Sequence, residues 1–174
     1  MPTGKRESIL AAALPLLLDG GAFSVDKLLK AAGAGIGTFY HHFPQGKEDL
    51  EAALRGEVAR EYEEGLARVL GRNRDAETGV KALVHHHLRW TAERPAAARL
   101  LLEQPKPPGP ELRREVRDWA ARAGLVGVSH DLLLAVWTGP VREWSRGRGT
   151  AGAEASADRL AVAAWAAVQS LALG

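Results

Sequence analysis

The 174-residue sequence contains no cysteine, so it forms no disulfide framework and offers no thiolate for catalysis. It also lacks any apolar run near the roughly 20 residues that a membrane-spanning helix needs. The N-terminus shows no secretory pattern, because Glu7 precedes its apolar residues and Pro15 interrupts them. With 46% apolar and 25% charged residues, we expect a folded, soluble, cytoplasmic protein with no membrane partner.

The first third of the chain also lacks a net charge. Residues 1–60 hold seven Lys/Arg and seven Asp/Glu, so the net charge of +2 comes from the remaining residues. A basic surface is the usual electrostatic sign of nucleic-acid binding. Charge alone therefore gives no argument for DNA binding by this segment. Any such contacts would depend on neutral donors, helix N-termini and a few cations.

Two short amphipathic patterns separated by glycine occupy residues 24–50. Ser24 is a suitable N-cap for the first pattern, and Gly33 suits the left-handed conformation that ends a helix. The apolar stripes are Val25, Leu28, Leu29 and Ala32, followed by Ile36, Phe39, Tyr40 and Phe43. Two helices of about two turns joined by a Gly-containing turn predict a helix-turn-helix. An ordinary αα-hairpin within a helical protein is the alternative.

The second of these helices would present one side to a partner. Its inward side comprises Ile36, Phe39 and Phe43, its outward side Gly37, Thr38 and His41, and its flanks Tyr40 and His42. Small residues would then lie toward base edges and hydrogen-bonding residues toward phosphates, which is the layout of a recognition helix.

The residues around this motif resemble the N-terminal domain of the TetR family of transcriptional regulators. The resemblance is carried by AAGAGIGTFYHHF at residues 31–43 and KEDL at residues 47–50, which follow the family pattern AGVSxGxLYxHFxxKExL. Arg6, Ile9, Leu10, Ala12 and Ala13 extend it upstream. The chain departs from the pattern at Gly35, where Ser or Thr is usual, and at Pro44–Gly46, which is one residue longer than the commoner form.

The resemblance implies an all-α fold of about nine helices, with a three-helix DNA-binding domain at residues 1–46 and a ligand-binding and dimerisation domain at residues 47–174. It implies a homodimer formed by the last two helices, which binds double-stranded operator DNA as a repressor and leaves it when a small apolar or aromatic inducer binds. By resemblance, the DNA-binding residues are Ser24, Gly35, Ile36, Gly37, Thr38, Tyr40, His41, His42 and Lys47.

Helical periodicity organises the rest of the chain. It predicts helices at residues 5–18, 47–71, 77–93, 111–123 and 155–173, a short helix from Pro95, and one from Ser129 that kinks or breaks at Gly139-Pro140. A Gly-rich loop is predicted at residues 146–153. The proline-rich stretch from Pro105 to Pro110 is predicted to be a loop within one domain.

Aromatic side chains of the second part are candidates for a ligand pocket. They are His87, Trp90, Trp119, Trp137 and Trp144, although helical spacing favours plain core packing for each of them taken singly. The triplet His85–His87 invites a metal-dependent enzyme or a helical small-molecule-binding protein as the alternative function. Adjacent histidines project about 100° apart on a helix and do not share one ion. We therefore expect no metal site, no cofactor and no catalytic residue.

Overall fold

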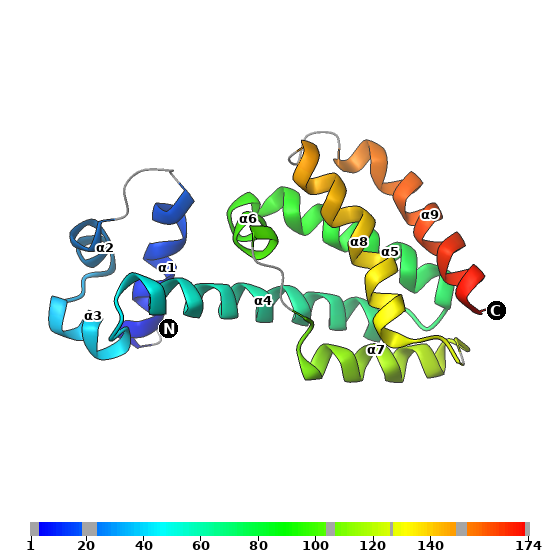
Figure 1. Ribbon diagram of the computed structural model, residues 1–174, viewed down its shortest axis with the longest axis horizontal. Helices are drawn as coiled ribbons and strands as arrows, with labels where there is room; N and C mark the ends of the chain where they lie inside the picture. The colour runs from blue at the N-terminus through cyan, green and yellow to red at the C-terminus, as the bar shows by residue number, and fades with distance from the viewer. Residues whose placement is uncertain (1–3, 19–23, 104–106, 126, 149–152, 173–174) are drawn as a thin grey trace. The chain divides into compact units, whose positions relative to one another are not determined.

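Every regular element in residues 4–18, 24–103, 107–125, 127–148 and 153–172, the part that the computed structural model describes, is an α-helix (Figure 1). The nine helices of these residues are α1 (Lys5–Leu18), α2 (Val25–Ala32), α3 (Ile36–His42), α4 (Lys47–Arg72), α5 (Ala76–Glu93), α6 (Pro95–Glu103), α7 (Pro110–Arg122), α8 (His130–Arg148) and α9 (Ala153–Ala172). The predicted all-α class is confirmed. None of the described helices combines the length and apolar character that crossing a bilayer requires.

Packing divides the chain into two units, Met1–Ala59 and Arg60–Gly174, with the division inside α4. The domain boundary predicted at residues 46 and 47 separates proposed roles rather than packing units, and it stays a prediction. The long α4 follows its sequence closely, because the apolar residues that recur at every fourth position are all buried. These residues are Leu50, Leu54, Val58, Tyr62, Leu66 and Leu70.

The first unit is built around two phenylalanines. Phe39 and Phe43 are almost completely buried, and their ring centroids lie 5.5 Å apart. Helix α1 packs on both α2 and α3, and it contributes Ile9, Leu10 and Ala13 to this core. Full burial of a large apolar side chain contributes about 1.5–3 kcal/mol. The small core therefore fixes α3, the shortest described helix, through its two ring anchors.

The second unit is organised around α5, which contacts α6, α8 and α9, while α7 packs on α8 (Figure 1). Asp75 caps α5, since its Oδ1 accepts a hydrogen bond from the Thr78 N–H at 2.8 Å. This bond holds the pKa of the Asp75 carboxyl below its usual value. The inward side of α5 carries the buried residues Val80, Leu83, Val84, His87, Trp90 and Thr91.

Glycine allows a large ring to sit directly on the α5 backbone. A Cβ atom at Gly79 would lie 2.4 Å from Cζ2 of Trp119, so no side chain fits there while the indole keeps its place. The same indole donates its Nε1–H to the carbonyl of Asn73 at 2.7 Å. Trp119 therefore joins α7 to the connection between α4 and α5.

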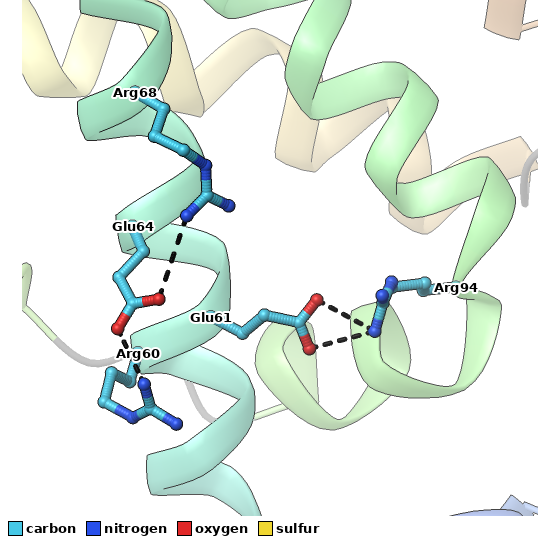
Figure 2. A network of polar contacts seen from close by, with 5 residues as sticks. All are labelled: Arg60, Glu61, Glu64, Arg68 and Arg94. Atoms are coloured by element: carbon cyan, nitrogen blue, oxygen red, sulfur yellow. Dashed lines mark hydrogen bonds and ion pairs between the residues drawn. The ribbon is translucent and has the colours of Figure 1, made fainter. Parts of the chain in front are cut away.

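Ion pairs on the surface of the second unit reinforce this arrangement (Figure 2). The guanidinium of Arg94, at the C-terminal cap of α5, lies 2.8 and 2.9 Å from the two carboxylate oxygens of Glu61 on α4. Along α4, Glu64 lies between Arg60 at 2.6 Å and Arg68 at 3.9 Å. These exposed pairs each contribute roughly 0–1 kcal/mol, so they orient helices rather than determine stability.

The start of the loop predicted from residue 146 is wrong, because helix α8 continues to Arg148. The helix has no break at Gly139-Pro140, and the kink that was the other possibility there stays a prediction. A proline removes a single helical hydrogen bond, and packing of α8 on α5 and α9 maintains the helix on both sides. In α6 the buried residues are Ala97 and Ala98, while the leucines that follow are half-buried.

Candidate functional site

The turn between α2 and α3 is shaped by caps at both ends of α2. Ser24 accepts a hydrogen bond from the Lys27 N–H at 3.4 Å, which confirms its capping role. Gly33 has a φ of 58°, the left-handed conformation that suits glycine, and its N–H points back to the carbonyls of Leu29 and Lys30. Lys5 donates from Nζ to the Gly33 carbonyl at 2.9 Å, so α1 also holds this turn.

Helix α3 begins without a side-chain cap. Gly35 has the extended backbone of an N-cap residue, but no side chain accepts from the first turn of the helix. An added Cβ would meet nothing within 4 Å at either Gly35 or Gly37. The N-terminal backbone of α3 is therefore open to close approach by a partner.

The solvent-facing side of α3, which we call the reading surface, is composed of Ile36, Gly37, Thr38, Tyr40, His41 and His42. Ile36 and Tyr40 are 54% and 51% exposed, which is unusual for such large side chains. The interpretation of Ile36 as a core residue is therefore wrong: it begins the helix, and Phe39 and Phe43 alone form the buried side. Gly37 and His41 are exposed, while Thr38 and His42 are half-buried.

The connection from α3 to α4 also has a defined geometry. Gly46 has a φ of 65°, and the Gln45 N–H donates to Oδ2 of Asp49 at 2.7 Å. The Tyr40 ring lies beside this turn, because a Cβ at Gly46 would be 3.7 Å from its Cε1. Lys47 lies at the start of α4 with its Nζ 3.4 Å from Oε1 of Glu51.

Sequence reasoning missed two of these partners. The Lys47–Glu51 pair has the i, i+4 spacing of a helical ion pair and was readable from the sequence. The bond from Lys5 to Gly33 joins residues 28 positions apart and left no local signal. The neighbouring Arg6 lies 3.6 Å from Glu57 of α4.

Comparison with known proteins identifies this arrangement. Residues 9–54 match the family model for bacterial regulatory proteins of the tetR family. Residues 9–54 are therefore a TetR-family N-terminal domain. The members of this family are transcription regulators with an N-terminal helix-turn-helix, so the family resemblance of residues 31–50 is confirmed. No curated protein matches the sequence.

Three solved structures, one of them of a TetR family transcription regulator, share the fold of nearly the whole chain. A TetR family transcription regulator from Marinobacter aquaeolei VT8 is 23% identical, with a TM-score of 0.63 and 94% of each chain covered. The regulator FadR from Bacillus subtilis, in complex with stearoyl-CoA, is 18% identical, with a TM-score of 0.67 and coverage of 92% of this chain and 98% of its own. RolR, in complex with resorcinol, is 19% identical, with a TM-score of 0.55 and coverage of 94% and 92%.

The second unit buries a polar pair, of which the sequence predicted one member as a ligand residue. His87 is 4% exposed, and its Nδ1 is hydrogen-bonded to the hydroxyl of Tyr62 on α4. The Tyr62 ring lies 5.0 Å from Trp90, centroid to centroid. The predicted residues His87 and Trp90 therefore both contact Tyr62, which was not among the predicted ligand residues.

The other predicted tryptophans form a second contact. Trp119 and Trp137 meet edge to face with ring centroids 5.5 Å apart. The Nε1–H groups of Trp90 and Trp137 are buried, and neither has an acceptor in the described part of the chain. The side chain of Trp144 lies outside the described residues. Trp90 and Trp137 thus carry buried donors that no acceptor among the described residues matches.

The histidine triplet separates into three environments. His85 lies 3.3 Å from Asp158 on α9, and His87 bonds to Tyr62. His86 packs against Gly65 of α4, and burial lowers its pKa, with nearby arginine charges acting in the same direction. In the described ranges no three His, Asp or Glu side chains lie close enough together to hold a metal ion. The metal-dependent alternative therefore has no supporting geometry.

Proposed function

We propose that this TetR-family regulator is a repressor that binds operator DNA through the reading surface and releases it when a small molecule binds in the second unit. The observation that carries the proposal is the exposure of Ile36 and Tyr40 on a helix whose other side is fixed by Phe39 and Phe43. Large apolar side chains held outward on a rigid support suit contact with a partner surface.

The residues of the reading surface would divide into two roles. Ile36, Gly37, Thr38 and His41 would approach base edges in the major groove. Tyr40, His42 and Lys47 would hold phosphates, with backbone N–H groups near Ser24 and Gly35 adding neutral donors. Phosphate contacts position the protein and base contacts select the sequence. Because residues 1–60 have no net charge, we expect a shallow dependence of binding on salt concentration.

A pair of variants tests this division of roles. Operator fragments are first selected from genomic DNA, and affinity is then measured by fluorescence anisotropy at fixed salt. Tyr40→Phe combined with His42→Ala should weaken binding to all sequences similarly, by roughly tenfold. Thr38→Ala should instead alter the preferred sequence. Arg122→Ala, a charge change on α7, is the control. Unchanged affinity of the double variant would sink the assignment.

The proposed inducer would bind within the interior that contains Trp90 and Trp137. FadR and RolR were solved with stearoyl-CoA and resorcinol, and these complexes support the proposal of a ligand with an apolar body and oxygen atoms. An unmatched buried donor costs about 1–3 kcal/mol, and a ligand oxygen would recover part of this. Trp90→Phe and Trp137→Phe should reduce release of the operator by an inducer identified from a metabolite panel. They should leave operator affinity without inducer unchanged. Loss of that basal affinity would argue against the assignment.

The proposed assembly is a homodimer through α8 and α9. These helices expose Leu132 and Val162, which are 49% and 56% accessible in the single chain. A two-fold pair would present two α3 helices to half-sites about 34–36 Å apart. Val162→Glu should give a monomer in sedimentation velocity and weaken operator binding. A dimer that persists at the same concentration would contradict this assembly.

A further inference from the structure

A groove of about 800 Å³ lies between α7 and the beginning of α8. One wall is the outer side of α7, and the opposite wall is the first residues of α8. Ligand sites in proteins commonly have volumes of about 300–1,000 Å³, so the groove is large enough for a small molecule. Its residues take no part in the reading surface, and none of them was among the predicted ligand residues.

Three arginines of α7 line this groove. They are Arg113, Arg114 and Arg117, and the only carboxylate among the described lining residues is that of Asp131. The formal charges of the three arginines and of Asp131 leave a balance of +2. The spacing of the arginines along α7 brings them to one side of the helix, so their charges act together.

The contacts of these arginines leave donors available. The Nε of Arg113 donates to the Pro108 carbonyl at 3.1 Å, and its Nη1 lies 3.8 Å from Asp131. Arg117 donates from Nε to its neighbour Asp118 at 3.0 Å. Arg114 has no ion pair or hydrogen bond within the described residues. Since a guanidinium carries five N–H donors, all three side chains retain donors for an anion.

The groove also has an apolar floor. Leu125 and Val128 line it and are themselves buried, 7% and 6% exposed. The positive end of the α8 helix dipole lies at the rim, next to Ser129. Positive charge at the walls and hydrocarbon at the floor match a molecule that is anionic at one end and apolar along its body.

We propose that this groove binds a small amphiphilic anion, with a carboxylate or phosphate on the arginines and an apolar body on Leu125 and Val128. Arginine pairs with both head groups through two parallel hydrogen bonds. A nucleic acid backbone would meet the arginines but would leave the apolar floor unused. The site is independent of the proposed operator binding and of the interior around Trp90 and Trp137.

Calorimetric titration of the full chain tests the site with decanoate and decyl phosphate, both below their micelle concentrations. Each should bind one per chain, and the stronger of the two identifies the head group. Decanol and decyltrimethylammonium should bind at least about tenfold more weakly, because each lacks the charge-assisted hydrogen bonds. Equal binding of decanol and decanoate, or no binding of either anion, would overturn the proposal.

Two variants locate the binding. The triple substitution R113Q/R114Q/R117Q should raise the dissociation constant about tenfold or more, whereas Arg122→Gln, on the same helix but outside the groove, should change it less than about twofold. Ala121→Trp fills the groove without altering charge and should also abolish binding. Circular dichroism melting confirms that each variant is folded. Binding that survives both the triple variant and Ala121→Trp would place the anion elsewhere and refute the assignment.

Discussion

The two units divide the aromatic residues of the chain between them. All three phenylalanines lie at positions 23–43, and all five tryptophans lie at positions 90–165. Phenylalanine has no polar atom, so the core around Phe39 and Phe43 needs no hydrogen-bond acceptor. Tryptophan brings an N–H that must be matched once it is buried. Of the tryptophans in the described core, Trp119 finds a carbonyl, whereas Trp90 and Trp137 do not.

The two interiors therefore differ in whether their large aromatic side chains need hydrogen-bond acceptors. In the described part of the first unit only the Nε–H of Arg55 is a buried side-chain group without an acceptor, and the large apolar side chains of Ile36 and Tyr40 lie outside, on the reading surface. In the second unit the unmatched indole N–H groups of Trp90 and Trp137 are buried in the interior. A surface that reads a partner benefits from a rigid support, whereas an interior that responds to a ligand benefits from groups that the ligand completes. The following predictions test this contrast.

The largest effect should come from removing a ring anchor of the first unit. Phe39→Ala should destabilise that unit by about 3–5 kcal/mol, because it leaves a cavity under α3. Circular dichroism would show early loss of helix. Tryptophan fluorescence, which reports only on the second unit, should keep its melting temperature. Tyr40→Phe, on the exposed side, is the control. A common fall of both melting temperatures would show that the two interiors are not independent.

A smaller effect should distinguish the matched indole from an unmatched one. Trp119→Phe and Trp137→Phe remove the same atoms from buried sites, but only Trp119→Phe breaks a hydrogen bond and leaves the Asn73 carbonyl without its donor. Urea unfolding should therefore show Trp119→Phe to be less stable by about 1–3 kcal/mol than Trp137→Phe. Equal losses would indicate that Trp137 has an acceptor in solution.

The smallest effect is a pH dependence of the second unit. Burial lowers the pKa of His86. The positive charges of Arg89 and Arg68 lower the same pKa further, whereas the negative charge of Glu93 raises it. The unfolded chain therefore binds more protons than the native state just below the usual histidine pKa of about 6.5. The contribution of His86 to the free energy of unfolding is fully present above that value and declines as the pH falls toward the folded-state pKa. His86→Gln should flatten this decline in urea midpoints between about pH 7.5 and 5.5. A slope equal to that of the unaltered protein would disprove the assignment.

The sequence predicted those parts of the fold that depend on long, regular patterns. Helix α4 is an example, because six apolar residues at every fourth position define a buried side without reference to neighbours. Ile36 shows the opposite case. It begins a helix of seven residues, and whether such a residue is buried depends on what packs above it.

Partnerships between distant residues were not predictable for the same reason. The periodicity of α4 and α5 showed that Tyr62 and His87 are buried, but not that they bond to each other across 25 positions. The three arginines of the groove are equally visible in the sequence. Only the packing of α8 beside α7 turns that charged side of a helix into a cavity wall.

The attachment of α7 has a consequence for the order of folding. The Trp119 indole reaches the Asn73 carbonyl, and the Gly109 N–H reaches Glu63, and each bond spans 46 positions. The neighbouring helices α4 and α5 meet over a much shorter loop, and short loops close at lower entropic cost. We therefore expect α4 and α5 to pair first and α7 to dock late. In native-state hydrogen exchange, the amides of α7 should then open before those of α5, since α7 can detach without disrupting that pair.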